Sequence, residues 1–134
     1  MFAHVWVEET CGWIMAPPER IPGPEALRTA ELTFVWGFLM DPEFIRGLVG
    51  RVIPFAPALI RGYRRETFLK DGKRGFRLIP QPEGVVMGVA LVGPTQEEVA
   101  ALDRFERVPE VMVKQRIEVT VGDLKREAGI YLAV

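Results

Sequence analysis

The stretch that decides the fold is Phe34–Met40, which reads FVWGFLM and is followed by an aspartate and a proline. Its apolar beginning, together with the two residues before it, predicts a buried strand that ends at Gly37. Asp41 is a typical helix N-cap, and proline is favoured at the first helical position, so a helix is expected over Pro42–Val49. A strand–turn–helix junction of this kind presents unpaired backbone N–H groups to an anion. A plain tight turn fits a single glycine equally well, and the residues alone favour it.

A second segment, Leu102–Glu106 (LDRFE), ends another predicted helix. That helix begins at Thr95–Glu98, which has the sequence of a capping box. Glu106 comes at its C-terminal end, where the helix dipole is negative. Apolar neighbours there would raise the pKa of the carboxyl toward the range of a general acid or base. The alternative is a solvated Glu106 paired with Arg104 or Arg107, and spacing alone favours it.

The remaining pattern predicts an α+β fold with a mostly antiparallel sheet. An extended N-terminal segment broken near Gly12 indicates a strand or hairpin, and a short helical turn is expected around Glu25–Ala30. Asp71-Gly72 marks a hairpin turn. The other expected strands are residues 56–69, 75–79, 85–92, 111–121 and 127–134, and the second expected helix is 96–105. We divide the chain into an N-terminal arm with a Pro-rich linker (1–31) and one domain (32–134).

Composition removes several function classes. The net charge of −1 with no basic stripe argues against nucleic-acid binding. No apolar run approaches the roughly 18 residues of a membrane span, and the acidic start is unlike a signal peptide. One cysteine, Cys11, fits a reducing cytoplasm. With one histidine (His4), no serine and no asparagine, catalysis would depend on carboxylates, backbone amides or a few hydroxyls, and no metal site is expected.

Taken in order and spacing, Phe34–Met40, Val86–Gly88 and Leu102–Glu106 resemble the gamma-glutamylcyclotransferase-like family, in its avirulence-induced-gene-like branch. That family carries a Tyr-Gly-Ser/Thr loop after its first strand, then a Val-x-Gly strand and a Leu-Asp-x-x-Glu helix end. Ile130–Leu132 looks like its last strand. The resemblance covers about residues 32–134 and implies a small mixed, mostly antiparallel β-barrel with two packed helices.

The resemblance also implies an activity, the release of 5-oxoproline from a small γ-glutamyl amine or amide, without metal or cofactor. In that family a glutamate, here Glu106, takes a proton from the substrate's α-amine and later protonates the leaving amine. The loop amides hold the substrate's α-carboxylate. The substrate-binding residues so implied are Trp36, Gly37, Phe38, Leu39 and Tyr131.

The chain departs from the family pattern at the loop and beyond the glutamate. Trp36 stands where the family has Tyr, Phe38 stands where it has Ser or Thr, and Val111–Lys114 lacks the common aromatic or arginine. Phe38 favours an alternative, a non-catalytic small-ligand binding or interaction module with the same fold. A plain hydrolase is less favoured, because nothing positions a water. The arm, residues 1–31, is expected to cover a sheet edge or to exchange with a second subunit as a homodimer.

Overall fold

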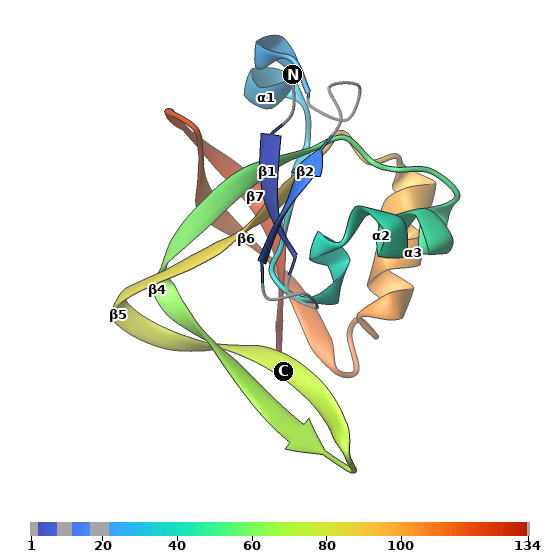
Figure 1. Cartoon of the computed structure of the whole chain (residues 1–134), viewed down its shortest axis with the longest axis vertical. Helices are drawn as coiled ribbons and strands as arrows, with labels where there is room; N and C mark the ends of the chain where they lie inside the picture. The colour runs from blue at the N-terminus through green and yellow to red at the C-terminus, as the bar shows by residue number, and fades with distance from the viewer. Residues whose placement is uncertain (1–2, 8–11, 17–21, 134) are drawn as a thin grey trace.

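The computed structural model describes residues 3–7, 12–16 and 22–133, and its centre is a closed five-stranded barrel in the order β3-β5-β4-β6-β7 (Figure 1). Neighbouring strands are antiparallel except β3 and β7, which run parallel. The predicted mixed, mostly antiparallel barrel is confirmed. In chain order the strands are β3 (Leu32–Val35), β4 (Phe55–Lys70), β5 (Lys73–Val92), β6 (Met112–Val121) and β7 (Leu124–Ala133).

The two predicted helices lie side by side on one flank of the barrel (Figure 1). The Asp41 side chain accepts a hydrogen bond from the Glu43 N–H at 2.9 Å and caps α2, which ends at the left-handed Gly50. Thr95 and Glu98 form the reciprocal capping box that begins α3. The helical segments are α1 (Pro24–Thr29), the 3-10 turn η3 (Phe38–Met40), α2 (Pro42–Val49) and α3 (Gln96–Phe105).

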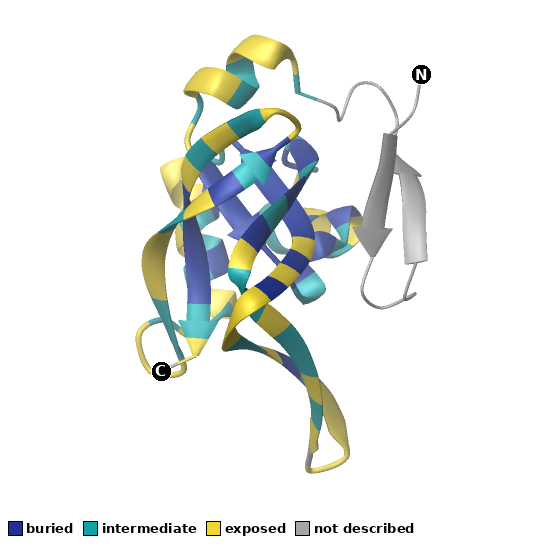
Figure 2. Ribbon diagram, turned by 90° about the vertical axis from the view of Figure 1, so that its left-hand side faces the viewer, coloured by how far each residue is buried: buried dark blue, intermediate teal, exposed yellow. Residues whose placement is uncertain are grey.

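The long hairpin of β4 and β5 corrects one prediction. The expected strands 75–79 and 85–92 are two halves of one strand, because the ladder resumes after the break at the prolines. Arg61 pairs with Val85 but Tyr63 pairs with Pro80, so residues 81–84 form a bulge, and Pro82 lies in it outside the paired residues. Beyond the bulge the hairpin projects from the barrel as an arm (Figures 1 and 2).

Side chains of the barrel strands pack into two apolar cores. Figure 2 shows that buried residues are concentrated on the barrel strands. Phe34 points into the barrel, and its neighbour Val35 joins the layer beneath α2 and α3, so β3 is buried on both faces. The Val-x-Gly segment on β5 has a steric reason. A Cβ at Gly88 would lie 2.5 Å from Cζ of Phe34, so only glycine lets that ring fill the barrel.

The N-terminal strands β1 (Ala3–Val7) and β2 (Gly12–Ala16) pair with each other, which confirms the predicted hairpin. They form a separate two-stranded sheet and do not extend the barrel. Cys11 and the linker prolines Pro17 and Pro18 lie outside the described residues. The domain boundary at residue 32 and the exchange with a second subunit stay predictions. Among the described residues, no helix is both long enough and apolar enough to cross a membrane.

Candidate active site

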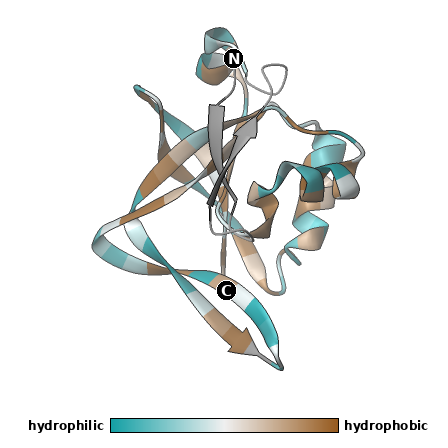
Figure 3. Ribbon diagram, in the orientation of Figure 1, coloured by the Kyte–Doolittle hydropathy of each residue, from teal (hydrophilic) through white to brown (hydrophobic). Residues whose placement is uncertain are grey.

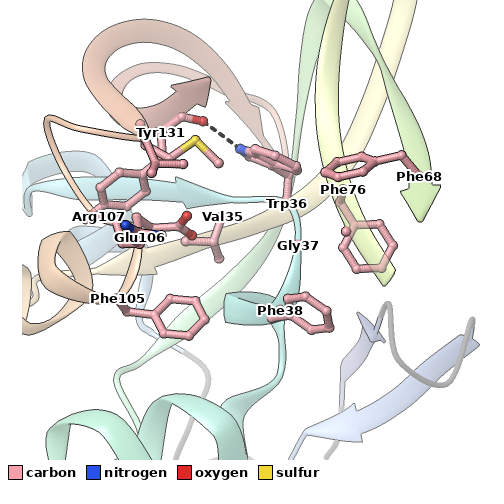
Figure 4. A pocket seen from close by; sticks show the side chains of 13 residues that line it. Val35, Trp36, Gly37, Phe38, Phe68, Phe76, Phe105, Glu106, Arg107 and Tyr131 are labelled. Carbon is pink, nitrogen blue, oxygen red and sulfur yellow. Dashed lines mark hydrogen bonds between the residues drawn. The ribbon is translucent and has the colours of Figure 1, made fainter. Parts of the chain in front are cut away.

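A cavity of about 230 Å³ opens where the end of β3, the end of α3 and the β4–β5 arm meet. Five of the six residues predicted for the site line it, namely Trp36, Gly37, Phe38, Glu106 and Tyr131. Leu39 does not line it, because its side chain is buried in the core beneath the helices. Figure 4 shows the loop and the glutamate on different walls of this one space. Residues seventy positions apart therefore share a site.

Glu106 occupies the C-cap of α3, where its backbone N–H donates to the Leu102 carbonyl at 2.9 Å. Its side chain is half-buried, and this burial raises the pKa of its carboxyl to about 7. Within the described part of the chain no ion pair involves it, so pairing with Arg104 or Arg107 is not observed. A carboxyl with this pKa exchanges a proton readily near neutral pH.

The Trp36–Gly37 junction begins the opposite wall. The Met40 N–H donates to the Gly37 carbonyl at 3.0 Å and forms the 3-10 turn. The first amides of such a turn have no partner within it. A Cβ built on Gly37 would meet only a Phe76 ring carbon, at an ordinary 3.8 Å. Neighbouring atoms therefore leave room for a Cβ at this position, and the glycine leaves space in the cavity.

Two donors fix this junction to neighbouring strands. The Trp36 indole N–H donates to the carbonyl of Tyr131 on the neighbouring strand β7 at 2.9 Å (Figure 4). Arg65 on β4 donates through Nε to the Trp36 carbonyl at 2.9 Å and through Nη2 to the Met87 carbonyl at 2.7 Å. Trp36 thus places a ring in the cavity wall and links the end of β3 to β7.

Tyr131 links the cavity to α3. Its hydroxyl donates to Oδ1 of Asp103 at 2.5 Å, one helical turn before Glu106, and Lys114 Nζ lies 3.6 Å from the same oxygen. Burial first, then the Asp103 bond, raise the pKa of the phenol well above its usual value, and the charge of Glu106 adds to the effect. The phenol therefore stays protonated and holds a fixed orientation beside the glutamate.

Sequence reasoning missed the aromatic side of the cavity. The rings of Phe38, Phe68 and Phe76, from η3, β4 and β5, form what we call the aromatic wall. Phe38 and Phe76 pack edge to face with centroids 5.0 Å apart. Figure 4 shows these rings on one side, with Phe105 and Glu106 on the other. Phe38 thus lines the cavity without filling it.

A signal for the wall was present in the sequence. Phe68 and Phe76 flank the predicted turn at Asp71-Gly72 at nearly equal distances, which brings them onto neighbouring strands. Other lining residues that the sequence did not single out are Phe105, Arg107, Val111 and Met112. In the described part of the chain, no three His, Cys, Asp or Glu side chains are grouped so as to hold a metal ion.

The barrel, the glycine junction and the half-buried glutamate across one cavity define a gamma-glutamylcyclotransferase-like protein. The family model described as "Gamma-glutamyl cyclotransferase, AIG2-like" matches residues 33–134. The chain belongs to this family, and the resemblance seen in its sequence is confirmed.

Comparison with known proteins gives relatives of modest identity. AIG2-like protein C of Arabidopsis thaliana is 32% identical over 97 residues, which cover 72% of this chain and 54% of the relative. The chain spans about half the length of the curated relatives it matches. A solution structure of an Arabidopsis thaliana protein superposes with a TM-score of 0.67 at 24% identity, over 78% of this chain and 68% of that one.

A structure described as a gamma-glutamyl cyclotransferase superposes with a TM-score of 0.64 over 79% of this chain and 68% of its own. The two chains are 17% identical, so this likeness establishes the fold alone.

Proposed function

We propose that this chain is a cyclotransferase that releases 5-oxoproline from a small γ-glutamyl amine or amide, with Glu106 as general acid and base. One observation carries the proposal. A half-buried carboxyl with a pKa of about 7, and with no ion-pair partner among the described residues, lies across one cavity from the Trp36–Phe38 junction. The family membership supports the same reaction.

The reaction needs an anion site and a proton carrier on opposite sides of the substrate. In the proposal the amides at Gly37 and Phe38, which line the cavity, bind the α-carboxylate, because the first amides of the 3-10 turn lack partners within the turn. The Glu106 carboxylate takes a proton from the substrate's α-ammonium. The freed amine attacks the γ-carbonyl carbon and forms a five-membered ring.

Collapse of the resulting tetrahedral intermediate breaks the bond between the γ-carbon and the leaving nitrogen. The Glu106 carboxyl returns its proton to that nitrogen, and its carboxylate then takes the second proton that the ring nitrogen must lose and passes it to the departing amine. The products are therefore 5-oxoproline and an ammonium ion. A single carboxyl near its pKa suits both transfers. Ring closure is intramolecular, so correct folding of the bound substrate supplies a large part of the rate enhancement.

Tyr131 completes the proposed site. Its hydroxyl is committed to Asp103, so its ring forms a fixed wall beside Glu106. In the proposal, a substrate bound against the apolar lining displaces water, and exclusion of water favours cyclisation over hydrolysis.

The test is to incubate the purified chain with γ-glutamyl amines and γ-glutamyl dipeptides and to measure 5-oxoproline by mass spectrometry. We expect release that depends on enzyme concentration and is lost in Glu106→Gln. Full activity of that variant would end the role given to Glu106.

A second function, a non-catalytic binding module, is favoured by one feature, the ring of Phe38 where the family has a hydroxyl. Under this alternative, a γ-glutamyl amine raises the melting temperature by linkage but is recovered unchanged after long incubation.

A further inference from the structure

The aromatic wall suggests which γ-glutamyl compounds the cavity accepts. We propose that Phe38, Phe68 and Phe76 receive the substituent of the leaving amine, so that preferred substrates carry an uncharged aromatic or alkyl group on the γ-nitrogen. A γ-glutamyl amino acid, which carries a carboxylate there, is the disfavoured class. This inference rests on the proposed function.

The residues that line the cavity indicate which part of the substrate each side binds. The charged groups of a γ-glutamyl compound, its α-carboxylate and α-ammonium, are taken up by the Gly37 junction and Glu106 in the proposed mechanism. The substituent on the γ-nitrogen then faces the remaining lining. Phe38, Phe68 and Phe76 supply that lining from three different elements, opposite Glu106 (Figure 4).

Phe68 is held over the cavity by its cross-strand partner. It pairs with Gly75, and a Cβ on that glycine would lie 2.6 Å from Cζ of Phe68. The ring therefore rests on the bare backbone of Gly75, an arrangement that orders an aromatic side chain on a hairpin. The ring of Phe68 therefore has a defined place on the projecting β4–β5 hairpin. Phe68 is not part of the barrel core.

The charges around the wall explain the discrimination against a carboxylate. The Arg77 guanidinium lies 5.3 Å from the ring centre of Phe68, but it forms an ion pair with Glu66 and does not line the cavity. Among the described lining residues, Arg107 is the single cation, and it lies with Glu106 on the far side (Figure 4). The Arg74 guanidinium likewise lies 5.3 Å from the ring centre of Phe76 but does not line the cavity. A carboxylate at the wall would therefore lose its hydration against the rings without a cation in the lining beside it.

The rim of the cavity is apolar as well. Phe105 and Val111 line it and remain 36% and 42% exposed. Large apolar side chains exposed around one cavity indicate a surface that a ligand covers. An apolar leaving group fits this surface better than a charged one.

The experiment compares three amides that differ in one feature each: γ-glutamyl phenethylamide, γ-glutamyl methylamide, which lacks the ring, and γ-glutamylphenylalanine, which adds a carboxylate. We expect kcat/KM for 5-oxoproline release to be roughly 10-fold to 100-fold higher for the phenethylamide than for the methylamide. The kcat/KM for the phenethylamide should also exceed the kcat/KM for γ-glutamylphenylalanine by about tenfold or more.

Variants of the β4–β5 hairpin test whether the preference for the phenethylamide depends on the aromatic wall. Phe68→Ala removes the ring, and Gly75→Ala forces it away from its place, so each should bring the phenethylamide-to-methylamide ratio close to one. Leu69→Ala is the matched control, because Leu69 is the next residue, is 77% exposed and does not line the cavity (Figure 3 shows apolar colour near this tip). Its ratio should match that of the unaltered chain.

The outcomes separate this inference from the proposed function. Equal kcat/KM values for the three amides, or a preference for γ-glutamylphenylalanine, would overturn the inference and leave the cyclotransferase activity standing. If no amide releases 5-oxoproline, the proposed function is wrong. The role of the aromatic wall is then tested by the Kd values of the amides, measured by calorimetry. Tighter binding of the phenethylamide than the methylamide, lost in Phe68→Ala, would support the wall, and equal Kd values would overturn it.

Discussion

The two ends of helix α3 place the same residue type in opposite environments. At the N-terminal end, Glu98 is 8% exposed, accepts hydrogen bonds from Arg51 at 2.5 and 2.6 Å, and accepts a third from the Thr95 N–H at 2.8 Å. The Arg51 bond, ahead of the cost of burial, lowers the pKa of the Glu98 carboxyl. At the C-terminal end, burial raises the pKa of Glu106 to about 7.

Burial alone therefore does not decide the pKa of a carboxyl in this molecule. Glu98 is well buried and still acidic, because a guanidinium and a backbone donor replace the lost water. The helix dipole adds to the contrast, since it favours a negative charge at the first turn and disfavours it at the last. Glu98 supports the fold, whereas Glu106 carries a destabilised charge, which is a common property of functional sites.

The largest expected effect separates the two glutamates by activity. Glu106→Gln keeps the shape of the side chain but cannot carry the proton, so 5-oxoproline release should fall about a thousandfold. Glu98→Gln is the matched control on the same helix and should retain kcat/KM within about twofold under conditions where it stays folded. The measurement is initial rate by mass spectrometry, and equal losses in both variants would show that the contrast has no catalytic meaning.

The next effect is the pH dependence of stability. Glu106 is more easily protonated in the folded chain than in the unfolded chain, whose pKa is the ordinary 4.5. The stability that protonated Glu106 contributes to the fold is complete below pH 4.5 and is lost as the pH rises through about 7. The free energy of unfolding should fall by up to about 3 kcal/mol over this range. Glu98, with its lowered pKa, acts in the opposite sense and loses its contribution as the pH falls below 4.5.

Urea titrations at pH 5 and pH 8 measure this fall, and Glu106→Gln should remove most of it. The variant should also be more stable than the unaltered chain at pH 8, because it replaces a poorly solvated charge with a neutral amide. An unchanged pH dependence in the variant would contradict the raised pKa.

Local sequence signals account for much of the frame of the site. Caps such as Asp41 and Thr95 act through hydrogen bonds to residues two or three positions away, so the helices begin where the sequence predicts. The Gly37 junction depends likewise on neighbours in the chain. Glu106 was singled out by its place at a helix end and by the family motif, both of which are visible in the sequence.

The lining of the cavity depends on contacts between distant segments, and sequence patterns do not specify these. The sequence predicted two separate strands at 75–79 and 85–92, whereas the structure joins them into β5 through a bulge, and Phe76 on this strand packs against Phe38. Sequence neighbours likewise did not decide the surroundings of Glu106, because Arg104 and Arg107 lie close to it in the chain and neither pairs with it in the described structure.

A smaller effect tests the structural role of Glu98. Glu98→Gln removes the charge that holds Arg51 and weakens the capping box, so the free energy of unfolding should fall by about 2 kcal/mol at pH 7. The control is Glu97→Gln, a neighbouring exposed residue with no cap contact, for which we expect a change within about 0.5 kcal/mol. Equal stability of the two variants would show that Glu98 does not stabilise the fold through Arg51 and the capping box.

The smallest expected effect concerns the wall that faces Glu106. Gly37→Ala adds a methyl group whose nearest neighbour is a Phe76 ring carbon at 3.8 Å, so stability should change by less than about 1 kcal/mol. The methyl group takes space in the cavity beside the proposed carboxylate-binding amides, so kcat/KM should fall about tenfold. Gly88→Ala is the contrasting variant, because its Cβ would lie 2.5 Å from Phe34 and should disturb folding itself. Full activity of a stable Gly37→Ala chain would mean that the junction is a plain turn and that Glu106 faces no substrate held there.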